Sequence, residues 1–225
     1  GTPTITLSTG GSGSSVNFTS GSGTTLLTFN YTVASGHNSN DLAYSASNSL
    51  ALNSATIKDS AGNDATLTLP SPSEAASLSF NKDIVIDTTS PTMTITSSTS
   101  GVSDGSTTKD ATISLTFTSS EATTNFTDAD ITVINGAISG FNPASSTTYT
   151  ATFTPTTDGA TTVDVAGNVF TDAVGNNNTA ATQFNWTYDS TPPIISAIGT
   201  GAFSWGAVLN ATEDNSNGTV SVTTS

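Results

Sequence analysis

The sequence predicts an all-β protein built from β-sandwich modules in tandem. Apolar and polar residues alternate with period two in most stretches between turn signals, which is typical of half-buried strands. A composite motif occurs twice, roughly one hundred residues apart: an acidic Gly-Asn turn, a last strand, and an Asp-led linker with proline. No convincing helix pattern appears. The stretch Ser73–Ser77 favours one short turn at most, because Pro70 and Pro72 lie beside it.

The alternation assigns the expected strands in chain order. In the first module, Leu27, Phe29, Tyr31 and Val33 share one face of a strand. In the second module, the residues that share inner faces are Ile113, Leu115 and Phe117; Tyr149, Ala151 and Phe153; Val163 and Val165; and Phe184, Trp186 and Tyr188. Threonine, β-branched and aromatic residues suit such half-buried pleated surfaces. Trp186 is therefore expected to face the core.

The composition allows small, ordered domains. The chain has 225 residues, enough for two domains of ordinary size with some chain left over. Its hydrophobic fraction of 34% is low, but the regular alternation argues against disorder and predicts one thin core per module.

The charge is strongly negative, with three Lys and Arg against seventeen Asp and Glu. A net charge of -14 argues against nucleic acid and anionic membranes as partners and is compatible with cations. It also suits a protein that is simply kept soluble by its surface. There is no cysteine, so a metal is the natural candidate for stiffening small extracellular sandwiches. No apolar run reaches the length of a membrane span, so we expect no direct insertion into a membrane.

The repeated motif places the expected boundaries. Residues 1–87 and 88–189 each form an immunoglobulin-like β-sandwich, and residues 190–225 are too short for a third. This last piece carries strand-like sequence at Ile194–Ile198, Phe203–Leu209 and Thr219–Thr223, so it either starts a partial third module or is an exchanged strand segment that pairs with a neighbour's edge. The chain opens Gly1-Thr2-Pro3 without a visible signal peptide, as a mature or excised fragment would.

A calcium site is expected where the two modules meet. In an immunoglobulin-type sandwich, the chain start, the B–C loop and the F–G loop share one end. This brings together Asp87, Glu121 and Asp172, with Asn176 in the same turn as Asp172. Like charges repel unless a cation neutralises them, and Ca²⁺ takes six to eight hard oxygen ligands.

Further candidate ligands lie in other turns and linkers. Asp41 closes an oxygen-rich loop, and Asp59 with Asn63 forms the first Gly-Asn turn; both are expected at the free N-terminal end of the first module. Asp189 would repeat the part of Asp87, with Glu213 and Asp214 as later ligands. Turn chemistry alone also explains an Asp-x-x-Gly-Asn sequence. Asp128 and Asp130 are expected to cap a turn before a strand at Ile131.

The residue types disfavour catalysis. His37 is the only histidine and lies in a polar loop, where we expect it to be solvated. Without cysteine, a familiar nucleophilic triad is hard to build, and the carboxylates fall in turns and linkers, so we expect no enzyme. The alternative is a carbohydrate- or surface-binding module, in which Trp186, Tyr188 or Trp205 would stack on sugar rings.

The second module resembles the bacterial Ig-like repeats of giant extracellular adhesins and surface-layer proteins. The matching stretches are Phe117–Ala122, Phe126–Val133, Tyr149–Pro155, Phe170–Asn176 and Tyr188–Pro192. The first module is similar to a companion repeat of such proteins through Ile57–Asn63 and Ile84–Thr89, and residues 203–214 look like the start of another repeat. The resemblance implies an extracellular, cell-surface spacer rigidified by Ca²⁺, in an adhesin, a surface layer or a filament. Its partners would be adjacent modules of a longer chain or other copies of itself, with a glycan or surface ligand as a further option.

Overall fold

The computed structural model of the chain describes residues 1–199 and 221–224, and these form two compact units. The first unit consists of Gly1–Met93, Ser119–Phe126 and Ala166–Ala180. The second consists of Thr94–Thr118, Thr127–Val165 and the described residues from Ala181 onward. Strands are by far the main regular structure of the described chain, so the prediction of an all-β protein is confirmed. The predicted boundaries at residues 87 and 189 stay a prediction.

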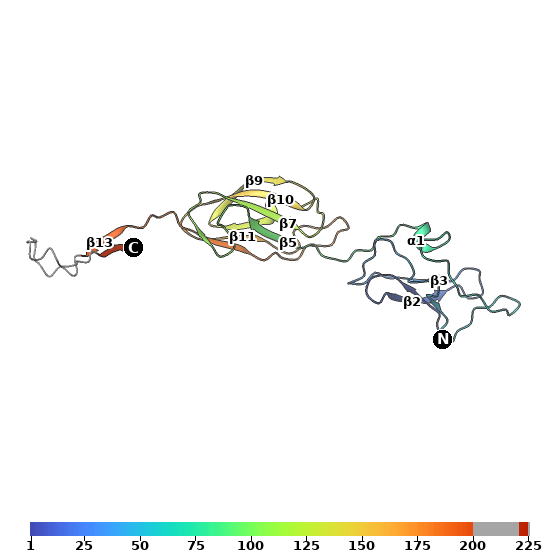
Figure 1. Cartoon of the computed structure of the whole chain (residues 1–225). Helices are drawn as coiled ribbons and strands as arrows, with labels where there is room; N and C mark the ends of the chain where they lie inside the picture. The colour runs from blue at the N-terminus through green and yellow to red at the C-terminus, as the bar shows by residue number, and fades with distance from the viewer. Residues whose placement is uncertain (200–220, 225) are drawn as a thin grey trace, which may run out of the picture. The chain divides into compact units, whose positions relative to one another are not determined.

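Two four-stranded sheets make up the sandwich of the second unit (Figure 1). One sheet has the order β5-β7-β10-β9 and the other β6-β12-β11-β8; only the β6–β12 pair is parallel. The bounds are β5 Met93–Ser97, β6 Thr107–Thr108, β7 Ile113–Ser119, β8 Ile131–Ile134, β9 Gly136–Pro143, β10 Thr148–Pro155, β11 Gly159–Val165 and β12 Phe184–Tyr188. A 3₁₀ turn, Asp128–Asp130, precedes β8, and Asp130 accepts a 2.8 Å hydrogen bond from the Thr127 amide, as expected of a capping carboxylate.

The core of this sandwich follows the predicted alternation. Ile113, Leu115, Phe117, Phe153, Val163, Val165 and Trp186 are all at most 2% exposed. Phe153 of β10 meets Trp186 of β12 edge to face, with ring centroids 4.7 Å apart, so side chains of the two sheets are in contact. Trp186 faces inward as predicted. Tyr188 is only half-buried, because it lies at the last position of its strand.

The first unit has a single four-stranded sheet of short strands, in the order β3-β2-β1-β4. Their bounds are β1 Thr4–Leu7, β2 Ser14–Ser20, β3 Thr28–Phe29 and β4 Leu50–Ala51. The core cluster consists of Leu7, Val16, Leu42, Tyr44 and Ile86. That this unit is a second sandwich stays a prediction.

A strand was predicted from Leu27 to Val33, but only Thr28–Phe29 is a strand, so the prediction is wrong for the residues after Phe29. Val33 is 51% exposed, and the Ala34 carbonyl accepts a hydrogen bond of 3.1 Å from the His37 amide, so the chain turns there. The Tyr31 hydroxyl bonds to Nδ1 of His37 at 2.8 Å, which fixes Tyr31 to this turn instead of to a strand ladder. The alternation correctly identified the inward side of Phe29 and Tyr31, but only Phe29 pairs with a neighbouring strand, opposite Phe18 of β2.

One short helix, α1 Leu78–Asn81, lies directly after the stretch for which only a turn was predicted. The Ser77 hydroxyl caps it by accepting a hydrogen bond of 3.2 Å from the Phe80 amide. The expectation that the chain has no helix is therefore wrong by this one turn. No helix among the described residues is long and apolar enough to pass through a membrane.

Two strands lie in the C-terminal piece. β13 (Ile195–Gly199) and β14 (Ser221–Thr224) pair antiparallel. The expectations for Trp205, Glu213 and Asp214 lie outside the described residues, and so does the expected strand at residues 203–209.

Candidate metal centre

Three carboxylates meet in the first unit, and they are the three expected at the module boundary. Asp87, Glu121 and Asp172 each offer an oxygen, and these oxygens all lie within 4.8 Å of one another. Asp87 starts the linker before β5, Glu121 follows the end of β7, and Asp172 lies in the turn after β11. Among residues 1–199 and 221–224, this is the only group of three or more His, Cys, Asp or Glu residues with that geometry.

The Asp172 turn fixes one carboxylate by hydrogen bonds. Its Oδ1 accepts from the amides of Val174, Gly175 and Asn176 at 2.8 to 2.9 Å, and Oδ2 accepts from the Asn176 side chain at 2.8 Å. Gly175 has a φ of 97°, a conformation that a residue with a Cβ rarely adopts. The sequence Asp-x-x-Gly-Asn thus folds as an Asp-centred turn, which aims the second oxygen of Asp172 away from the backbone amides.

The linker that carries Asp87 is also fixed locally. Oδ1 of Asp87 accepts a hydrogen bond of 2.9 Å from the Thr89 amide, and the Thr88 amide donates to the Asn38 side-chain oxygen at 2.8 Å. The Thr88 hydroxyl donates to the His37 carbonyl at 3.1 Å. Isolated bridge pairing between Ser39 and Ile86 holds the same loop against the residue before Asp87.

Glu121 is placed by the turn that follows β7. The Ser120 amide donates to the Thr92 carbonyl, and the Thr92 amide donates to the Ser120 hydroxyl, both at 2.9 Å. These bonds secure the backbone on either side of the site, while no hydrogen bond to the Glu121 carboxylate occurs within the described part of the chain. Glu121 is therefore the carboxylate with the fewest protein partners.

The electrostatics separate Glu121 from Asp172. Burial raises the pKa of Glu121, and the neighbouring charges of Asp87 and Asp172 raise it further. Burial also raises the pKa of Asp172, which is 7% exposed, but hydrogen bonds from the side chain and amide of Asn176 and from the next amides outweigh it. The pKa of Asp172 therefore lies below its usual value, so this carboxylate stays charged beside Glu121.

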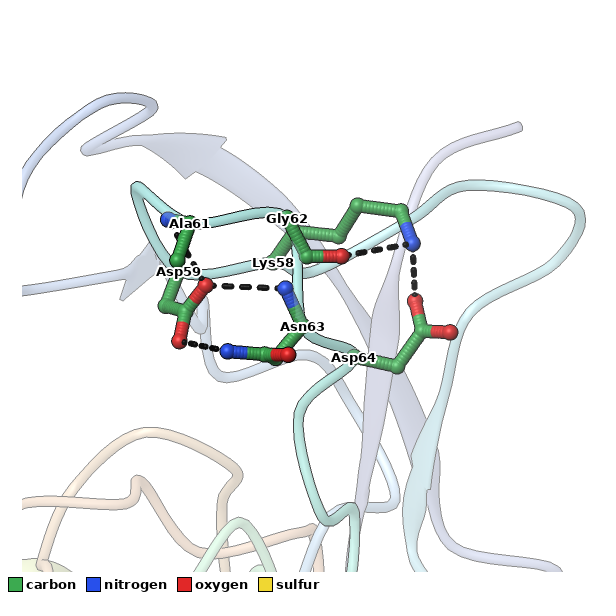
Figure 2. A network of polar contacts seen from close by, with 6 residues as sticks. All are labelled: Lys58, Asp59, Ala61, Gly62, Asn63 and Asp64. Carbon is green, nitrogen blue, oxygen red and sulfur yellow. Dashed lines mark hydrogen bonds and ion pairs between the residues drawn. The ribbon is translucent and has the colours of Figure 1, made fainter.

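Protein cations do not offset this charge. The sequence has three, Lys58, Lys82 and Lys109. The one ion pair in the part of the chain that the structure describes joins Lys58 to Asp64 at 2.5 Å (Figure 2). Three mutually close carboxylates without a basic partner suit an external cation.

The donor set suits Ca²⁺. Hard carboxylate oxygens are its usual ligands, and three carboxylates can supply several of the six to eight that it takes, with water completing the sphere. Beside the cluster lies an open hollow of about 280 Å³, lined by residues that include Asp87, Glu121, Asn38 and Asn40. If an ion binds, Asp87, Glu121 and Asp172 would hold it.

The first Gly-Asn turn has one backbone amide bond fewer to its aspartate than the Asp172 turn, and its surroundings differ (Figure 2). Oδ1 of Asp59 accepts from the amides of Ala61 and Asn63 at 2.8 to 2.9 Å, and Oδ2 accepts from the Asn63 side chain at 2.8 Å. Asp59 is exposed, and it is not gathered with two other acidic groups in the described chain. Its pKa is lowered, first by the Asn63 side chain. The turn explains Asp59 and Asn63 without an ion.

The remaining predicted ligands fall outside the cluster or play another part. Asp41 is exposed. Asn176 lies at the site, but its side chain offers the amide nitrogen, which donates to Asp172 Oδ2 and, at 3.2 Å, to the Asp87 carbonyl. Asp189 is exposed, and its Oδ1 accepts a 3.1 Å hydrogen bond from the Thr191 amide, as Asp87 does from Thr89. The partners expected for Asp189 lie outside the described residues.

Two features were missed from the sequence. The loop containing Asn38 and Asn40 was expected at the opposite end of its module, yet it lines the hollow beside Asp87, because Ser39 pairs with Ile86. His37 was expected to be solvated; it is half-buried, bonds to Tyr31 and to the Ser14 hydroxyl (3.1 Å), and stacks on the Tyr31 ring. The Asn-rich composition of the loop was its only signal, and local sequence does not reveal its pairing.

The comparisons with known proteins identify one part of the chain. In the searches with the chain, no curated protein and no solved structure matches. Residues 87–188, a little under half of the chain, match the model of a family described as Bacterial Ig-like domain. This fold is a structural module and not a catalytic one, and the two sheets of the second unit agree with it. Residues 87–188 are therefore similar to a bacterial Ig-like domain.

Proposed function

We propose that this protein is a structural, non-enzymatic spacer of an extracellular surface protein, stiffened by Ca²⁺ at the boundary before its bacterial Ig-like domain. The protein would serve in an adhesin, a surface layer or a filament, and its partners would be neighbouring modules or other copies. The observation that carries the proposal is the convergence of Asp87, Glu121 and Asp172 to within 4.8 Å. These residues come from three segments far apart in the sequence, so an ion that binds all three ties those segments together.

The energetic case rests on the uncompensated charge. Without an ion, three carboxylates repel one another across a half-buried site, and the raised pKa of Glu121 reflects both its burial and this repulsion. Ca²⁺ turns the repulsion into attraction. At a free concentration one hundred times the dissociation constant, binding adds about 2.7 kcal/mol to stability. That is a sizeable part of the ~5–15 kcal/mol that holds an ordinary domain folded.

A calcium titration with a matched pair of variants tests the proposal. Asp172→Asn and Asp59→Asn change the same position of two turns in which the aspartate accepts the same hydrogen bonds from the amide and side chain of an asparagine, but only Asp172 lies in the cluster. By calorimetry, the native protein and Asp59→Asn are expected to bind Ca²⁺ with dissociation constants of about 10⁻⁴–10⁻³ M, the range of extracellular modules. Asp172→Asn is expected to bind at least tenfold more weakly, because a charged ligand is lost.

Stiffness is measured on the same three proteins by small-angle scattering with Ca²⁺ and with the chelator EGTA. The native chain and Asp59→Asn are expected to become more extended or more uniform in Ca²⁺, and Asp172→Asn is expected not to respond. A native protein whose melting and scattering curves are the same in both solutions would refute the proposed function.

A further inference from the structure

We propose that Asn176 is the positioning residue of the carboxylate cluster: its side-chain amide ties the Asp87 linker to the Asp172 turn, and it does so without an ion. The sequence predicted Asn176 as a metal ligand, through its side-chain oxygen. In the structure its nitrogen makes the contacts, to Asp172 Oδ2 at 2.8 Å and to the Asp87 backbone carbonyl at 3.2 Å. An amide nitrogen is a donor with no free lone pair, so this atom cannot be a ligand.

The Asn176 side chain makes a contact outside its own turn, and the structure of the turn does not require that contact. Asn63, at the matching place in the first Gly-Asn turn, makes the same bond to its own aspartate, Asp59, at 2.8 Å. The bond from Asn176 to Asp87 has no counterpart there. Asn176 and Asp87 are far apart in sequence, so the contact fixes the separation between two of the three carboxylates.

The linker is held from its other side as well. Asn38 accepts the Thr88 amide at 2.8 Å, and the Thr88 hydroxyl contacts the His37 carbonyl and the Gly36 amide. Asn176 therefore completes a set of hydrogen bonds that grips residues 87 and 88 from two loops. A site whose ligands are positioned before the ion arrives binds more tightly, because less ordering accompanies binding.

The same arrangement begins at the next linker. The Ser190 amide donates to Asp158 Oδ1 at 2.8 Å, as the Thr88 amide donates to Asn38, and Asp189 accepts the Thr191 amide as Asp87 accepts Thr89. Both linkers thus share a pattern of backbone amides held by side-chain acceptors. This recurrence indicates that linker shape is set by hydrogen bonds within the chain.

Hydrogen exchange tests the tie in the absence of calcium. The variants are Asn176→Ala, Asn176→Asp and, as the matched control, Asn63→Ala, all in EGTA. Both Asn176 variants are expected to raise amide exchange at Thr88 and Thr89 about 2- to 10-fold, the effect of one lost hydrogen bond, while Asn63→Ala leaves these amides at native rates. Native protection at Val163 in each variant shows that the sandwich is folded. Native exchange at Thr88 and Thr89 in both Asn176 variants would overturn the proposal.

The affinity for calcium gives a second readout, which rests on the proposed function. Asn176→Ala is expected to weaken binding about 10- to 100-fold, the usual loss when a residue that orients a ligand is removed. Asn63→Ala is expected to bind as the native protein does. If the native protein binds no Ca²⁺ but Asn176→Ala still loosens the linker in EGTA, the tie stands and the proposed function falls. If Asn176→Asp binds Ca²⁺ more tightly and keeps native linker exchange, Asn176 is a ligand and the tie is wrong.

Discussion

Replacing Glu121 by glutamine should have opposite effects on stability without and with calcium. Glu121 forms two like-charge pairs, with Asp87 and Asp172, whose facing oxygens are no more than 4.8 Å apart. At that distance a pair of unit charges interacts by about 1 kcal/mol in water and by roughly 3.5 kcal/mol at an effective dielectric constant of 20. Because Glu121 is half-buried and partly screened, the low end applies. Glu121→Gln should therefore stabilise the calcium-free protein by about 1–2 kcal/mol.

In calcium the sign should reverse. The glutamine offers a neutral and weaker ligand, so the variant forfeits most of the ~2.7 kcal/mol that the native protein gains at one hundred times its dissociation constant. Thermal melting in EGTA and in Ca²⁺ measures the two expected changes in stability, because each kcal/mol shifts the melting temperature by about 2–4 °C. Glu74→Gln is the control, since Glu74 is exposed and outside the cluster. If Glu121→Gln melts below the native protein in EGTA, or gains as much from calcium, the electrostatic argument is wrong.

The pH dependence of the calcium-free protein follows from the same residue. The pKa of Glu121 is raised in the folded state, first by burial and then by Asp87 and Asp172. The folded protein therefore binds a proton more readily than the unfolded chain, and the resulting stability is fully present below the ordinary glutamate pKa and is lost as pH rises through the raised value. In EGTA, native stability should fall with rising pH in that window, and Glu121→Gln should remove this fall.

Two further predictions concern the second unit. Gly136→Ala should destabilise the sandwich by about 1–3 kcal/mol in urea unfolding, because the new methyl group would collide with the buried Phe153 ring; a variant as stable as the native protein would show that β9 has room there. Asp158→Asn should flatten the loss of stability in acid. Hydrogen bonds from the linker, first from the Thr191 hydroxyl and then from the Ser190 amide and hydroxyl, lower the pKa of Asp158, so its contribution is present above the ordinary aspartate pKa and is lost as pH falls through the lowered value. Acid unfolding followed by circular dichroism distinguishes this from an unchanged curve, which would contradict it.

The sandwich was predictable because its strands are long and its two inner faces meet. Phe117, Phe153 and Trp186 each follow strict alternation, and each is almost completely buried. The first unit was harder to predict, because its strands are short. Tyr31 obeys the same alternation, but it bonds to His37 instead of extending a ladder. Alternation reports which side of a segment is buried, and it does not report whether a neighbouring strand is available.

The convergence of the three acidic residues could be predicted from the sequence, but the contacts of the asparagine side chains could not. Asp87, Glu121 and Asp172 converge because an immunoglobulin-type topology brings the chain start and two loops to one end, and that topology could be inferred from strand order. Asn38 lies beside the site because Ser39 pairs with Ile86, and no local sequence pattern predicts that pairing. Asn176 lies in the predicted turn, but an amide can donate or accept, and only its neighbours decide which atom faces the site.

The two Gly-Asn turns show why the motif alone does not define a metal site. Asp59 and Asp172 accept the same hydrogen bonds from an asparagine four residues later, so the turn accounts for both sequences. Asp172 accepts one further amide, from Gly175, and the surroundings of the two turns differ. Asp172 faces two more carboxylates without a basic partner. In the first turn, Lys58 precedes Asp59 in the sequence and forms an ion pair with Asp64. A cation lowers the free energy where negative charge is concentrated and unpaired. The functional signal therefore lies in the long-range convergence of acids at a turn that would form in any case, and variants that alter one turn at a time can separate the two effects.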